Sequence, residues 1–116
     1  MKIISSRLHG ILDYLMVVFL LASPILFEME NPLAGFIYGL AAIHFLLTVL
    51  TKFELGIIRI IPLAVHGLIE FFVSVALVLV SFWFNKNGNE TGYYYCLFLA
   101  LAIMLLFVLT DYRRKR

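Results

Sequence analysis

Four long apolar stretches dominate this chain, at residues 8–27, 33–51, 60–84 and 93–110. Each stretch is close to the roughly 20 residues that a helix needs to cross the hydrocarbon core of a bilayer. The chain is 64% hydrophobic with a mean hydropathy of +1.05, and a soluble domain of 116 residues cannot bury that much apolar surface. We therefore predict an all-α membrane protein with four transmembrane helices, forming a single transmembrane domain over residues 1–116.

The lysines and arginines indicate how these helices are oriented, because basic residues mark the cytoplasmic side of short loops. Eight of the nine lie before the first stretch, between the second and third, or after the fourth: Lys2, Arg7, Lys52, Arg59, Arg113, Arg114, Lys115 and Arg116. Lys86 alone lies in the opposite connections. We predict that both termini are cytoplasmic, and that the basic tail serves orientation and lipid contact rather than nucleic-acid binding.

The sequence contains an internal repeat. "LHGILDYL" at 8–15 matches "VHGLIEFF" at 65–72, and "VLTKFE" at 49–54 matches "VLTDYR" at 108–113. The repeats cover about residues 7–54 and 64–113, and each holds two predicted spans, so the second repeat begins on the same side of the membrane as the first. We predict two tandem parallel-repeat hairpins that pack as a four-helix bundle.

These motifs resemble the SPW-repeat family of small bacterial integral membrane proteins, which is named for a Ser-Pro-Trp sequence near the end of the first helix of each repeat. The first repeat has Ser23-Pro24-Ile25 and the second has Ser81-Phe82-Trp83, so each keeps two of the three positions. The resemblance implies a two-hairpin integral membrane protein of the bacterial inner membrane and implies no particular activity.

Five ionisable residues inside the predicted spans are candidate site residues. His9 precedes Asp13 by four positions, and His66 precedes Glu70 by four, so each pair shares one helix face. Ionisable groups in a span usually face the bundle interior. We expect both pairs near the cytoplasmic end of the bundle axis, with His44 from the second helix at a similar depth.

The candidate residues support more than one function. The leading interpretation is a non-enzymatic protein in which the pairs form an interhelical polar cluster, acting through self-association or a membrane partner. Arg7 and Arg59, at the same boundary, are candidate partners of the acids. The alternative is a membrane metal-binding or proton- or ion-coupled protein that uses the same residues; haem between the two repeated histidines is disfavoured by their place near the boundary.

Catalytic chemistry has little support in the sequence. The serines sit in no nucleophile motif, and no glycine-rich phosphate loop is present. Cys96 is the one cysteine, which excludes an internal disulfide, and we expect it to pack as a small apolar residue. We predict no catalytic residue and no bound cofactor.

Overall fold

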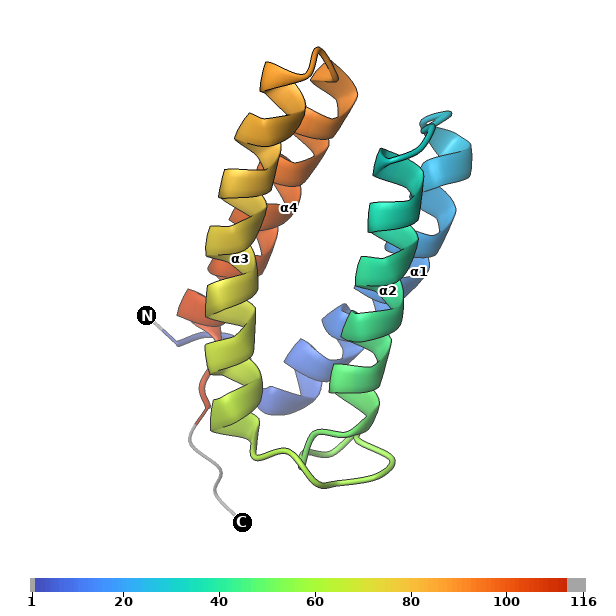
Figure 1. Ribbon diagram of the computed structural model, residues 1–116. Coiled ribbons are helices and arrows are strands. Elements are labelled where there is room, and N and C mark those ends of the chain that lie inside the picture. Colours follow the sequence, from blue (N-terminus) through green and yellow to red (C-terminus); the bar gives the residue numbers. More distant parts are fainter. Residues whose placement is uncertain (1, 113–116) are drawn as a thin grey trace.

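Two antiparallel helical hairpins stand side by side in this protein (Figure 1). The computed structural model describes residues 2–112. Its helices are α1 (Ser6–Leu26), α2 (Leu33–Val49), α3 (Leu63–Lys86) and α4 (Glu90–Leu109). α1 packs on α2 and α3 packs on α4, so the prediction of an all-helical chain with four helices is confirmed for the described residues.

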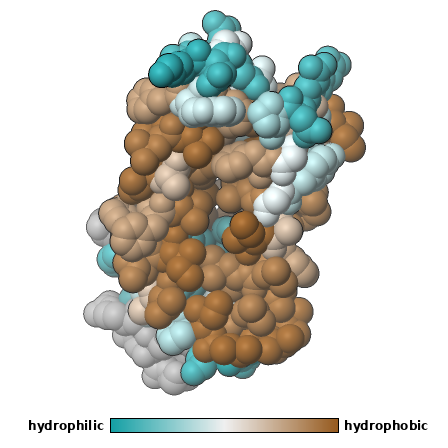
Figure 2. Space-filling model, in the orientation of Figure 1, coloured by the Kyte–Doolittle hydropathy of each residue, from teal (hydrophilic) through white to brown (hydrophobic). Residues whose placement is uncertain are grey.

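The flanks of the hairpins are apolar, as expected of a protein in lipid. α1, α3 and α4 are long and apolar enough to cross a membrane. In the most apolar 18-residue segment of each, 39%, 33% and 39% of the residues are buried inside the protein. The remainder faces outward, where hydrophobic side chains cover most of the visible surface between the two ends (Figure 2). α2 is apolar but has 17 residues, so a fourth span stays a prediction.

Local sequence explains where the helices begin. The side chain of Ser5 accepts a hydrogen bond from the Leu8 N–H at the start of α1, and that of Asn89 accepts one from the Gly92 N–H at the start of α4. Pro62 immediately precedes α3. Proline favours the start of a helix, because its missing N–H would have no helical partner there and its φ is already helical. The third apolar stretch therefore becomes helical at residue 63 rather than 60, and residues 50–62 connect the hairpins.

The chain segments before the two hairpins make matching contacts. Ile4 forms a parallel bridge with Thr110, and Ile61 forms a parallel bridge with Thr51. The start of each sequence repeat is thus bonded to the end of the other. These bridges tie the hairpins together at the end of the bundle opposite the two helix–helix turns (Figure 1).

The main apolar core lies between and within the hairpins, with Leu20, Ile37, Leu77 and Leu99 almost completely buried. Cys96 is part of this core, as expected from its apolar surroundings. Gly35 and Gly39 have the spacing that permits close helix approach, but a Cβ at Gly39 would have no neighbour within 4 Å. Within the described residues, that pattern is not used for helix packing.

Candidate functional site

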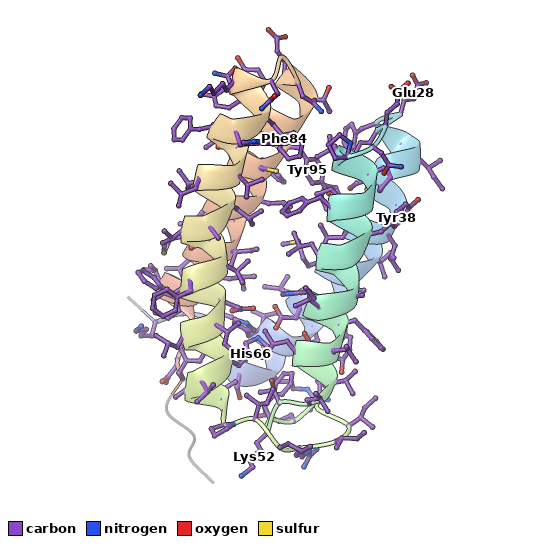
Figure 3. All side chains as sticks on the ribbon, viewed as in Figure 1. Glu28, Tyr38, Lys52, His66, Phe84 and Tyr95 are labelled. Carbon is purple, nitrogen blue, oxygen red and sulfur yellow. The ribbon has the colours of Figure 1, made fainter. Side chains whose placement is uncertain are left out.

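Four ionisable side chains from two helices meet between the hairpins. His9 and Asp13 come from α1, and His66 and Glu70 come from α3; we refer to these four as the quartet. Their exposed fractions are 0%, 0%, 0% and 2%, so they are buried within the protein. Figure 3 shows His66 in the lower part of α3, directed toward the space between the hairpins.

The quartet is a closed ring in which nitrogen and oxygen alternate. Asp13 Oδ2 lies 3.1 Å from His9 Nε2 and 3.0 Å from His66 Nε2. Glu70 Oε1 lies 3.0 Å from His9 Nε2, and Glu70 Oε2 lies 3.0 Å from His66 Nε2. Each acid therefore contacts both histidines, including the one on the other hairpin, which the i, i+4 spacing alone did not predict.

His44 lies at the edge of this ring. Its Nε2 atom is 3.5 Å from Asp13 Oδ1, so the fifth candidate residue does approach the others. At the corresponding place in the second hairpin, α4 carries Ile103, which is buried in the apolar core. A histidine and an acid thus come from each hairpin, whereas His44 has no counterpart in the second hairpin.

Two threonines orient the histidine rings. Thr110 Oγ1 lies 2.7 Å from His9 Nδ1, and Thr51 Oγ1 lies 2.7 Å from His66 Nδ1. Both threonines are fully buried. In the sequence these threonines stand out only as part of the repeated "VLT" motif. A polar residue repeated at the end of an apolar helix in both halves is the signal that points to their role.

Two aromatic rings, those of Phe53 and Tyr112, lie against the quartet. A Cβ at Gly10 would lie 2.2 Å from the Phe53 ring, and a Cβ at Gly67 would lie 2.7 Å from the Tyr112 ring. Glycine after each histidine therefore leaves the space that the aromatic ring occupies. Tyr112 also donates its hydroxyl to Glu70 Oε1 at 3.3 Å. Burial, together with the charge of Glu70, raises the pKa of this phenol above its ordinary value.

Arg7 and Arg59 were predicted to pair with the acids of the quartet, and the structure does not show this pairing. Arg59 donates to the backbone carbonyls of Gly56 and Glu54, both at 3.1 Å, and not to the acids of the quartet. Arg7 is exposed. Within the described residues, the side chains seen in contact with the two buried carboxylates are those of the three histidines and Tyr112. The tail at 113–116, which carries the remaining basic residues of the orientation argument, lies outside the described residues.

The quartet has the composition of a cation or proton site. Ser74 donates to the backbone of its own helix, as expected, and Ser23 and Ser81 do likewise. Among the described residues, His9, Asp13, His66 and Glu70 offer ligand atoms that all lie within 4.8 Å of one another. Such a set can share protons, or it can hold a metal ion.

In comparisons with protein-family models, curated proteins and solved structures, nothing matches this chain. The resemblance to SPW-repeat proteins accordingly stays a prediction.

Proposed function

We propose that this chain is a four-span, non-enzymatic protein of the bacterial inner membrane, built from two tandem parallel repeats of the SPW-repeat type, in which the quartet clasps the two hairpins together. In this proposal both termini are cytoplasmic, and the protein works by association with itself or with another membrane protein. The apolar flanks and the one-sided distribution of Lys and Arg support this location and orientation.

The observation that carries the proposal is the crossed pattern of contacts in the quartet. Asp13 of the first hairpin contacts His66 of the second at 3.0 Å, and Glu70 of the second contacts His9 of the first at 3.0 Å. Polar contacts between helices stabilise membrane bundles by roughly 0.6–2 kcal/mol each. The clasp therefore stabilises the association of the two hairpins at the end of the bundle where they meet.

The outward apolar surface supports association within the membrane. Large hydrophobic side chains are exposed on every helix, including Val18, Ile43, Leu79 and Leu101 at 61–66% exposure. Lipid chains or a neighbouring helix would cover such residues equally well, because both are apolar. A chain of four helices has little interior in which to enclose a pathway, so association is the simpler role.

The proton- or ion-coupled alternative has weaker support. Beside the quartet, a cavity of about 20 Å³ is bordered by Glu70 and His44, and its other lining residues are aliphatic side chains and a methionine. That volume suits about one water molecule. Since this lining offers no further polar group, a conducted ion would have no partner along the next part of the bundle axis.

A double-mutant cycle tests the clasp. Asp13→Asn and Glu70→Gln should each lower the unfolding temperature of the protein in detergent, and their combined effect should differ from the sum of the two, because the residues share both histidines. Glu30→Gln, at an exposed position between α1 and α2, is the control. Additive, small effects would contradict the clasp. Light scattering and in-membrane crosslinking test association, and a strictly monomeric, partner-free protein would contradict that role.

A further inference from the structure

We propose that the quartet is a binding site for one divalent transition-metal cation, held by the Nε2 atoms of His9 and His66 and by the carboxylates of Asp13 and Glu70. The inference deepens the proposed function, since the metal would join the same two hairpins that the clasp joins. It stands on the geometry of the four ligand atoms and on the hydrogen bonds that orient them.

The threonines determine which nitrogen of each histidine faces the quartet with a lone pair. Thr51 donates its hydroxyl proton to the Leu47 carbonyl at 2.6 Å, and Thr110 donates its own to the Leu106 carbonyl at 2.5 Å. Each hydroxyl oxygen can then only accept from the histidine Nδ1, so Nδ1 carries the proton. In the neutral ring, Nε2 is left with a lone pair that points into the quartet. A histidine whose Nδ1–H is held by an outer partner is the usual arrangement of a metal ligand.

The spacing of the ligand atoms suits a four-coordinate ion. Neighbouring atoms around the ring are 3.0–3.1 Å apart. Zinc bound at 2.0–2.1 Å by four such ligands would place them about 3.3 Å apart. One ligand atom from each of the four residues already lies within 4.8 Å of the other three, so small side-chain shifts bring them to the ion. Two imidazoles and two carboxylates match the ligand preferences of zinc and its first-row neighbours.

Several atoms of the quartet lack a hydrogen-bond partner although they are completely buried. These atoms are His9 Nε2 and both carboxylate oxygens of Asp13. Buried polar atoms without a partner are costly, and here an acceptor faces another acceptor whenever the histidines are neutral. A cation between them would satisfy these atoms together, and its two positive charges would balance the two carboxylates.

His44 extends the site outward. Its Nε2 also lacks a hydrogen-bond partner and lies 3.5 Å from Asp13 Oδ1, the oxygen that does not face the other histidines. In the metal-bound protein this imidazole would donate to the free oxygen of the ligating carboxylate and hold it in place. His44 is therefore assigned as a positioning residue rather than a ligand.

Metal binding to the intact protein tests the proposal. The protein would be purified in detergent without a histidine tag, stripped with a chelator, and titrated with Zn²⁺ by calorimetry and with Co²⁺ by visible absorption. We expect one ion per chain, a tetrahedral Co²⁺ spectrum, and a higher unfolding temperature after zinc is added. Folded wild-type protein that binds no zinc saturably, and whose unfolding temperature is unchanged by zinc or chelator, would overturn the proposal.

Variants separate the ligands from their surroundings. Thr110→Val keeps all four ligands and should weaken zinc binding by roughly 10–100-fold, the usual effect of removing an outer-shell partner. Asp13→Asn should weaken it further, and Glu30→Gln should leave it unchanged. Equal affinity in wild type and Thr110→Val would contradict the assigned site.

The metal and the clasp fail in different ways. If Asp13→Asn destabilises the protein while the wild type binds no zinc, the clasp is supported and the metal site is wrong. If zinc binds stoichiometrically but Asp13→Asn leaves the metal-free protein as stable as before, the metal site stands and the clasp is wrong.

Discussion

His9 Nδ1 lies 2.7 Å from Thr110 Oγ1, although the two residues are 101 positions apart in the chain. His66 makes the same contact with Thr51 at 2.7 Å. Each histidine is thus oriented by the residue that closes the other half of the molecule. Because these contacts cross between the halves, neither hairpin can complete the polar site alone.

Loss of the charge on Asp13 should be strongly destabilising. Asp13→Asn replaces a carboxylate that contacts three imidazoles with an amide that cannot balance them. Removing one partner of a buried ion pair costs about 3–5 kcal/mol. Chemical or thermal unfolding in detergent, monitored by circular dichroism, measures the loss. A stability equal to that of Glu30→Gln would show that the carboxylate is dispensable.

Thr51 should matter through its hydroxyl oxygen and not through its shape. Thr51→Val has nearly the same volume but leaves the Nδ1–H of His66 without an acceptor, which should cost about 1–3 kcal/mol. Thr51→Ser keeps the oxygen and should recover most of that loss. The same unfolding assay compares the three proteins, and equal stability of the Val and Ser variants would contradict the role given to the hydroxyl.

Gly10 and Gly39 should respond in opposite directions to alanine. A Cβ at Gly10 would lie 2.2 Å from the Phe53 ring, and overpacking of this kind costs about 1–3 kcal/mol. At Gly39 a Cβ has open space, and alanine in a helix interior is favoured over glycine by roughly 0.5–1 kcal/mol. Thermal unfolding of Gly10→Ala against Gly39→Ala tests the contrast, which equal shifts would contradict.

The ring of Tyr112 should contribute more than its hydroxyl. The hydroxyl contact with Glu70 is long, at 3.3 Å, and phenylalanine already fills the matching position at Phe53. We expect Tyr112→Phe to change the free energy of unfolding by less than about 1 kcal/mol, within the range for a single net hydrogen bond. Tyr112→Ala removes the ring from Gly67 and should cost about 3 kcal/mol or more. If the two variants are equally unstable, the hydroxyl is the important group.

Orientation in the membrane can be measured by cysteine labelling. In a Cys96→Ala background, Asn87→Cys lies in the turn between α3 and α4, and Ile57→Cys lies in the connection between the hairpins, where Ile57 is 72% exposed. The one-sided basic residues predict that a membrane-impermeant maleimide labels position 87 in intact cells and position 57 only after permeabilisation. The reverse pattern would invert the proposed topology.

Much of the architecture could be read from the chain because it depends on local pattern. The apolar stretches predicted four helices, and proline and the capping residues Ser5 and Asn89 set where three of them begin. The repeated His-Gly and acid positions located four of the five candidate residues, and these four meet in the folded protein, while His44 approaches Asp13. α2 ended at residue 49 rather than 51, since Thr51 pairs with the segment before α3 instead of continuing the helix.

What the sequence by itself determined is the kind of helix, the apolar surface, and the presence of two histidines and two acids at equivalent helix positions. The tertiary structure decided how they are combined. Spacing of i, i+4 places His9 beside Asp13, but only the approach of the two hairpins brings His66 to 3.0 Å from Asp13 Oδ2. The hydrogen bonds of Thr51 and Thr110, and the rings that cover Gly10 and Gly67, also depend on contacts between the chain halves. Such contacts follow from how two surfaces fit together, which no local periodicity records.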